Sequence, residues 1–104
     1  MIDQAYDLAA RNSLANRTVD LDELEQNLRK IGTLSASEIK AALKNASEAL
    51  HESAAIIRDH AVGESRVSND VLKLAASTIT AAHEVLDAII FSEARRAVGV
   101  VHRS

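Results

Sequence analysis

The fold is decided by residues 35–63, which read SASEIKAALKNASEALHESAAIIRDHAVG. Ser35 and Glu38 form a capping box at its start, because the serine hydroxyl can accept from the Glu38 backbone N–H while the glutamate reaches back. Apolar residues then recur every three or four positions, the spacing of one helix face. They are Ile39, Leu43, Ala46, Leu50, Ala54, Ile57 and Ala61. Gly63 supplies a stop, so the stretch predicts one long helix.

A second long helix is predicted over residues 68–99, after a short polar turn. Ser68 can cap its start and Gly99 can end it. Because the turn is short, the two helices are expected to pack antiparallel as a hairpin. The second helix carries two apolar stripes: Val71, Ala75, Thr78, Ala82, Val85 and Ile89, and beside them Leu72, Ala76, Ile79, Leu86 and Ile90. One helix cannot cover so wide an arc, so the N-terminal residues, a second subunit or another protein must cover the rest.

The N-terminal part shows two shorter helical patterns, near Asp3–Asn16 and Leu21–Ile31. Thr18 or Asp20 can cap the second one. A chain of 104 residues has room for one domain only. We therefore expect an all-α domain, a hairpin with one or two short N-terminal helices, completed by dimerisation. The expected divisions are short helices within 1–34, long helices at 35–63 and 68–99, and a tail at 100–104.

Composition disfavours several classes of protein. The chain has no proline and three glycines, too few turn residues for many loops or a sheet. It has no cysteine, which fits a reducing cytoplasm. Its first residues lack the basic start and apolar run of a signal peptide, and no stretch approaches the about 18 uninterrupted apolar residues of a membrane span. A net charge of −3 disfavours nucleic acid. We expect a cytoplasmic protein that binds neither nucleic acid nor membrane.

Glu48 and His51 have the Glu-x-x-His spacing of carboxylate-bridged metal sites in helical bundles, since residues three apart share a helix face. In the expected hairpin His83 and Glu84 lie roughly opposite them. A homo-oligomeric, ferritin-like metal protein is therefore the alternative interpretation, although the second such motif is missing. The sequence contains no nucleophile turn and no glycine-rich phosphate loop. We therefore expect neither enzymatic activity nor a cofactor.

The far end of the second long helix is dense in apolar residues, and such surplus surface usually marks an interaction site. The predicted partner-binding residues are Leu86, Ile89, Ile90, Phe91 and Val98. Packing against the helix at 21–31 is the alternative. The same end carries the basic group Arg95, Arg96, His102 and Arg103. These cations complement the helix dipole or contact an acidic partner.

Three short motifs carry a family resemblance: Leu43-Lys-Asn-Ala-Ser-Glu-Ala-Leu50, Asp59-His-Ala61 and Glu64-Ser-Arg66. Over residues 42–90 the chain resembles a family of small all-helical pseudomonad proteins of unassigned function. In size and layout it is also similar to quorum-sensing antiactivators of the QslA and TraM type, which bind a LuxR-type regulator and block its dimerisation or DNA binding. Likeness of layout is an analogy. It implies a small regulatory protein that binds and occludes a protein partner such as a transcription factor.

Overall fold

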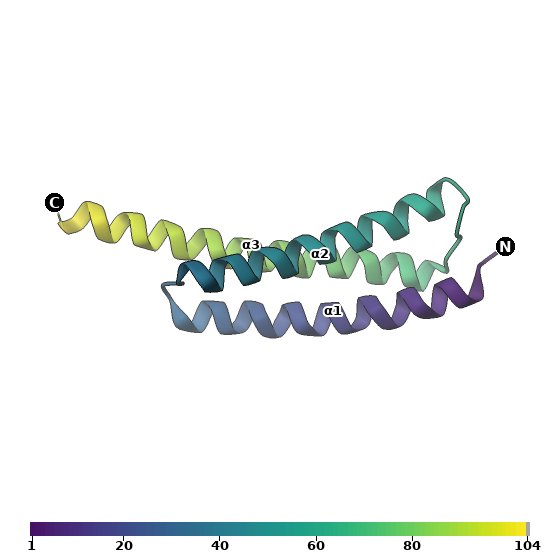
Figure 1. Cartoon of the computed structure of the whole chain (residues 1–104), viewed down its shortest axis with the longest axis horizontal. Coiled ribbons are helices and arrows are strands. Elements are labelled where there is room, and N and C mark those ends of the chain that lie inside the picture. The colour runs from purple at the N-terminus through teal and green to yellow at the C-terminus, as the bar shows by residue number, and fades with distance from the viewer. Residues whose placement is uncertain (104) are drawn as a thin grey trace.

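A computed structural model describes the backbone of residues 1–103 and the side chains of residues 1–98. This part of the chain has no strand and forms three helices: α1 (Gln4–Ile31), α2 (Ala36–Ala61) and α3 (Asn69–Arg103). The expected all-α class is confirmed. The chain reverses direction at both connections, so the helices lie along one long axis (Figure 1). α1 packs against α3 as extensively as α2 does, whereas α1 and α2 touch little. α3 is therefore the helix on which the other two pack.

α1 is one helix of 28 residues, where the sequence predicts two short ones. Its span contains no glycine or proline that would break it. Thr18 does not cap a second helix, because its hydroxyl lies 2.8 Å from the Leu14 carbonyl oxygen one turn earlier. The same hydroxyl lies 2.8 Å from the Thr78 hydroxyl on α3. Thr18, a candidate cap in the sequence, thus lies within one continuous helix, and its hydroxyl is hydrogen-bonded within α1 and to α3.

α2 begins and ends where the sequence predicts. The Glu38 N–H donates to the Ser35 hydroxyl at 3.2 Å, and the Ser35 N–H donates to the Glu38 carboxylate at 2.9 Å. The hydrogen bond from the Ser35 backbone holds the pKa of Glu38 below its usual range. After the helix, Gly63 adopts a φ of +78°, a left-handed conformation that favours glycine. Both boundaries are local features, which explains why the sequence suffices to predict them.

The buried face of α2 differs from the predicted one. Its buried residues are Ala42, Ala46, Ala49, Ser53 and Ile56. Leu43 and Ile57, both expected in the core, are 44% and 37% exposed, and Leu50 is half-buried. Small side chains allow α2 to approach α3 closely, and Arg17 of α1 donates to Glu52 on the α1 side of α2 at 2.6 Å. α2 therefore turns Leu43 and Ile57 outward, while Ile56 is buried.

α3 buries the first of its two predicted stripes and leaves the second partly open. The buried stripe is Val71, Ala75, Thr78, Ala82, Val85 and Ile89. In the second stripe Leu72, Ile79 and Leu86 are half-buried, and Ile90 is exposed. Gly99 does not end α3, which continues to Arg103, since a helix tolerates one glycine at about 1 kcal/mol. Of the expected tail, Ser104 lies outside the described residues.

Polar contacts hold each connection against the helix that passes it, α1 at one end and α3 at the other. Near the first turn of α1, the Ser68 N–H donates to the Asp7 carboxylate at 2.6 Å. This backbone hydrogen bond is the main reason that the pKa of Asp7 lies below its usual range. At the other end the Leu34 N–H donates to the Ser92 hydroxyl at 3.0 Å, and Arg96 donates to the Leu34 carbonyl oxygen. α1 is thereby held along one side of α3.

Candidate interaction surface

The predicted partner-binding residues fall into two groups. Ile89 is only 7% exposed and belongs to the core, and Leu86 is half-buried against that core. Ile90 is 64% exposed, and Phe91 and Val98 are each 54% exposed. The alternative interpretation, packing against α1, thus holds for Ile89. Ile90, Phe91 and Val98 remain available to another molecule.

The exposed group begins level with the α1–α2 connection, where Leu34 contacts Ser92 and Arg96, and α3 then continues past the ends of α1 and α2 (Figure 1). Here Phe91, Ala94, Arg95 and Val98 line a shallow, open hollow of about 420 Å³. The Arg95 guanidinium lies 5.7 Å from the centre of the Phe91 ring, a cation–π distance. We call this segment, residues 90–98, the overhang. Its exposed side combines aromatic, aliphatic and cationic surface, while Ser92 is buried and Arg96 contacts Leu34.

The basic group at this end is partly used within the chain. Arg96 lies 3.6 Å from Glu93 and also donates to the Leu34 carbonyl oxygen. Arg95 stacks on Phe91. The side chains of His102 and Arg103 lie outside the described residues. A mainly structural role therefore accounts for Arg96, whereas Arg95 contributes to the hollow.

A second apolar surface follows the seam between α2 and α3 on the side away from α1. It consists of Leu43, Leu50 and Ile57 on α2 and of Leu72, Ile79 and Leu86 on α3. In each helix these residues are seven apart, so they share one face. All six are half-buried or exposed. We call this surface the open seam. Sequence reasoning assigned its α2 half to the core, although the heptad spacing was a signal that could have identified it.

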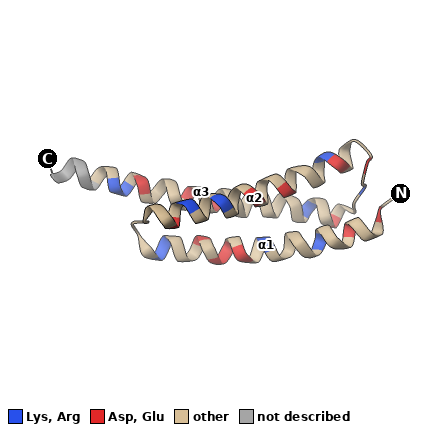
Figure 2. Cartoon of the chain, viewed as in Figure 1, with Lys and Arg blue, Asp and Glu red and all other residues tan. Residues whose placement is uncertain are grey.

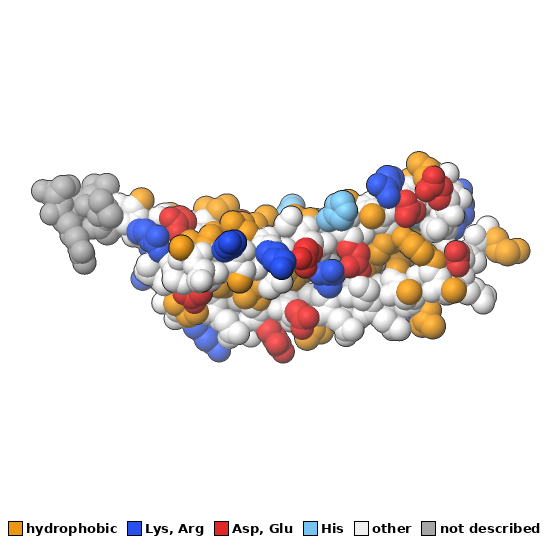
Figure 3. All heavy atoms as spheres, viewed as in Figure 1, with side chains coloured by type: hydrophobic (Ala, Val, Ile, Leu, Met, Phe, Trp, Pro, Cys, Tyr) orange, Lys and Arg blue, Asp and Glu red, His pale blue; other side chains and the backbone are white. Residues whose placement is uncertain are grey.

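Hydrophobic side chains are visible on this face of the molecule. Figure 3 shows them along α2 and α3 in the half nearer the C-terminus, next to Lys and Arg side chains, and again between α2 and α1 in the other half. Figure 2 shows that the first half of α2 carries two cations close together, which are Lys40 and Lys44. The apolar surface is thus bordered by positive charge on its α2 side.

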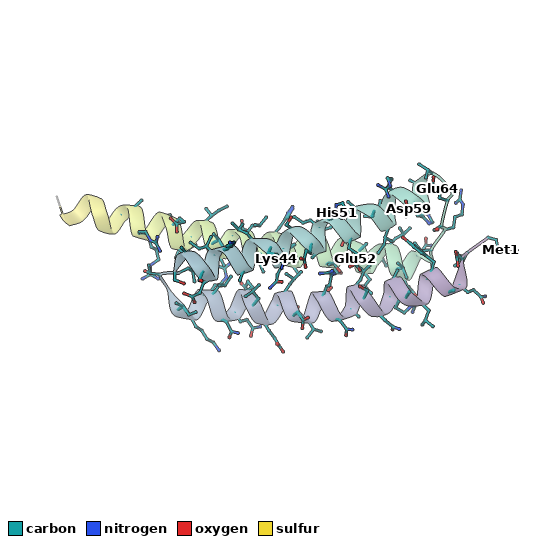
Figure 4. The ribbon with its side chains drawn as sticks, in the orientation of Figure 1. Met1, Lys44, His51, Glu52, Asp59 and Glu64 are labelled. Carbon is teal, nitrogen blue, oxygen red and sulfur yellow. The ribbon has the colours of Figure 1, made fainter. Side chains whose placement is uncertain are left out.

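The acids of α2 lie on its other side, against α1. Glu52 and Glu48 lie 2.6 Å and 3.9 Å from Arg17, and Asp59 accepts from the Tyr6 hydroxyl at 3.3 Å. In Figure 4 Glu52 points from α2 toward α1. The basic residues Lys44 and Arg58, and between them His51, directly follow the three α2 residues of the open seam in sequence. Glu48, Glu52 and Asp59 therefore lie on the α1 side of α2, and the basic residues lie on the other side.

The residues of the metal alternative do not come together. Glu48 lies beside Arg17 on the α1 side, whereas Glu84 lies 3.7 Å from Arg29. His51 and His83 are both exposed. Among the described residues no three histidine, aspartate or glutamate side chains are grouped closely enough to hold a metal ion. Within one copy, the chain's geometry gives the alternative no support.

A further hollow, of about 230 Å³, lies between α1 and α2. It is lined by Arg17, Asp20, Leu21, Leu24, Asn45 and Ala49. Its one cation, Arg17, is engaged by Glu52 and Glu48. The hollow therefore lies where these two helices pack loosely, and its arginine is already used in ion pairs within the chain.

α3 is long and apolar enough to cross a membrane by length and composition alone. The candidate stretch is Asn69–Val98, with a mean hydropathy of 1.4. The sequence criterion of an uninterrupted apolar run was too narrow to find it. A core helix of a globular domain passes the same test, and α3 carries the buried stripe on which α1 and α2 pack. Composition therefore does not assign this helix to a bilayer.

No family model, no curated protein and no solved structure matches this chain. The resemblances drawn from the sequence therefore stay predictions.

Proposed function

We propose that this chain is a small, non-enzymatic, cytoplasmic regulatory protein that binds and occludes a protein partner. The antiactivator-like layout suggests that this partner is a transcription factor. The proposal includes the hairpin of α2 and α3 and its completion by a second copy. The overhang is the surface that contacts the partner.

The observation that carries the proposal is the position of Phe91. The chain has one phenylalanine and one tyrosine, and its phenylalanine is more than half exposed directly before Ser92, the residue of α3 that contacts the α1–α2 connection. Exposed aromatic residues in a hollow with an arginine are typical of the residues that dominate binding energy at interfaces. In the single chain the exposed part of the ring forgoes the stabilisation of burial.

The surrounding residues suit a helical or apolar partner segment. Val98 lies one heptad after Phe91 and Ala94 lies between them, a spacing that a second helix can pack against. Arg95 borders the hollow and favours a partner with an acidic residue nearby. Such a partner would be blocked wherever it uses the same apolar segment for its own dimerisation.

The test is capture of a regulator from the source cells, followed by its own DNA-binding assay. We expect the chain to retain a transcription factor and to abolish the binding of that factor to its operator. Phe91→Asp should weaken capture by roughly thirtyfold, the loss of one interface hot spot of about 2 kcal/mol. Val19→Asp, on an exposed valine of α1, is the matched control and should leave capture unchanged.

Two results would contradict the proposal. One is that no regulator is captured, or that a captured one binds its operator normally. The other is that Phe91→Asp and Val19→Asp behave alike, which would exclude the overhang as the contact surface.

A further inference from the structure

The connection between α2 and α3, residues 62–68, lies at the same end of the bundle as the start of α1 (Figure 1). Within this stretch only Val67 is buried, and it belongs to the core cluster that contains Leu14, Ile56 and Val71. The residues around it are exposed or half-buried. The position of the connection therefore depends on one apolar side chain and on the polar contacts beside it.

Two consecutive backbone N–H groups of the connection donate to ionisable side chains. The Val67 N–H donates to Nδ1 of His60 at 3.1 Å, and the Ser68 N–H donates to the Asp7 carboxylate at 2.6 Å. His60 is half-buried in the last turn of α2, so its ring lies against the connection that follows it. Both acceptors can bind a proton, and each would then lose acceptor capacity.

The chain returns to His60 because it reverses direction at Gly63, whose φ is +78°. The turn is closed by the Asp59 carbonyl oxygen, which accepts from the Glu64 N–H at 2.9 Å and from the Ser65 N–H at 3.2 Å. These hydrogen bonds join backbone groups, which do not titrate. The turn itself is therefore independent of pH, whereas the contact at Val67 is not.

The hydrogen bond at His60 requires the neutral ring. A backbone N–H can only donate, so the ring nitrogen that faces it must carry no proton. An imidazolium has a proton on both nitrogens, and protonation would therefore place two donors against each other at 3.1 Å. The Val67 N–H would lose its acceptor, which is costly for a buried backbone group. The closed connection and the protonated ring are thus incompatible.

We propose that His60 is a pH-sensitive switch: the neutral imidazole holds the α2–α3 connection against the core, and protonation of the ring loosens the connection around Val67. Histidine is the side chain whose charge ordinarily changes between about pH 5 and 8. The contact at Ser68 stays in place over this range, because its backbone hydrogen bond keeps the pKa of Asp7 below its usual range. Loosening is therefore confined to the residues before Ser68.

The other ionisable groups at this end of the molecule do not replace the lost acceptor. They are Arg58 and Asp59 on α2, Glu64 and Arg66 in the connection, Asp3, Tyr6, Asp7 and Arg11 at the start of α1, and Asp70 on α3. Figure 4 shows Asp59 and Glu64 at this end. Asp59 already accepts from Arg58 at 3.1 Å and from the Tyr6 hydroxyl at 3.3 Å.

These groups keep their charges while His60 titrates. Arginine stays protonated, and carboxylates ordinarily lose their charge only near about pH 4. Burial and the neighbouring Asp59 raise the pKa of Tyr6, which therefore stays neutral. The nearby carboxylates favour an imidazolium electrostatically, but they offer the Val67 N–H no acceptor. The loss of the hydrogen bond at Val67 therefore follows the charge of His60.

The experiment is amide hydrogen exchange of the full chain, read at Val67 by NMR at about pH 7.5 and about pH 5. In His60→Asn the side-chain oxygen takes the place of Nδ1 and accepts at both pH values. Wild type and variant should protect the amide equally at the higher pH. At the lower pH the wild type should protect it roughly fivefold less, the loss of one hydrogen bond. Comparison at one pH cancels the effect of pH on the exchange chemistry.

His51→Asn is the matched control, since His51 is an exposed histidine of the same helix. It should respond to pH like the wild type. A His60→Asn variant that loses protection at the lower pH as the wild type does would overturn the proposal, because the response would then belong to another group. Wild-type protection that does not change would overturn it as well.

A titration of the wild type decides the question even if His60→Asn does not fold. The ring nitrogens of His60 and the backbone amide of Val67 are followed by NMR in one sample. The neutral ring should carry its proton on Nε2, and the Val67 amide signal should shift along the titration curve of the ring. An Val67 amide that stays unchanged while His60 titrates would contradict the proposal.

Discussion

The two apolar rows of α2 differ in side-chain size and in burial, and the composition of the helix does not show this difference. The inner row, Ala42, Ala46, Ala49, Ser53 and Ile56, is buried and small except for Ile56, whereas the outer row, Leu43, Leu50 and Ile57, is large and partly exposed. Burying a leucine contributes about 2 kcal/mol, so the single chain leaves part of this stabilisation unused in the outer row. The difference indicates that a close approach of the backbones decides which residues of α2 face α3.

A substitution at Ala46, which is fully buried against α3, should show the largest difference between the two rows. We expect Ala46→Leu to lower the free energy of unfolding by about 1–3 kcal/mol, because the added atoms force the helices apart. Ala41→Leu, at an exposed position of the same helix, should change it by less than about 0.5 kcal/mol. Urea unfolding of both variants measures the difference. Equal effects at the two positions would show that the inner row does not depend on small residues.

One substitution in the inner row should make the fold more stable. Ser53 is fully buried, and its hydroxyl has no hydrogen-bond partner among the described residues. Ser53→Ala should therefore raise the free energy of unfolding by about 1 kcal/mol, since a buried unsatisfied hydroxyl is costly. Ser47→Ala, at an exposed position, should gain only the about 0.5 kcal/mol of helix propensity. A smaller gain at Ser53 than at Ser47 would mean that the Ser53 hydroxyl is satisfied in solution.

How far the sequence could predict this molecule depends on whether a feature is local. The capping box of Ser35 and Glu38, the stop at Gly63 and the buried first stripe of α3 follow from neighbours in the chain. The rotation of α2 does not, because it depends on packing against both α3 and α1, where Arg17 contacts Glu52. The sequence likewise could not show that Thr18 joins two helical patterns through its contact with Thr78.

The candidate site shows the same division. Ile90, Phe91 and Val98 were predicted as surface from an excess of apolar residues, and they are exposed. Ile89 belonged to the buried stripe as well, and periodicity alone could not separate the two roles. The α2 half of the open seam was missed because hydrophobicity was taken as the sign of a core face.

The smallest expected effect concerns the contact that positions α1. Because the Ser68 N–H lowers the pKa of Asp7, this carboxylate stabilises the fold above its ordinary pKa, and the contribution is lost as pH falls through the lowered pKa. We expect Asp7→Asn to melt a few degrees below the wild type at pH 7, with the gap closing below about pH 4. Thermal melts at both pH values check this. A gap that persists at low pH would assign the effect to packing.

The most direct test of the central claim, that the exposed end of α3 contacts a protein partner, compares the capture of that partner by Phe91→Asp and by Val19→Asp. The predicted result is that Phe91→Asp weakens capture by roughly thirtyfold and that Val19→Asp leaves it unchanged. Equal capture by the two variants would contradict the claim.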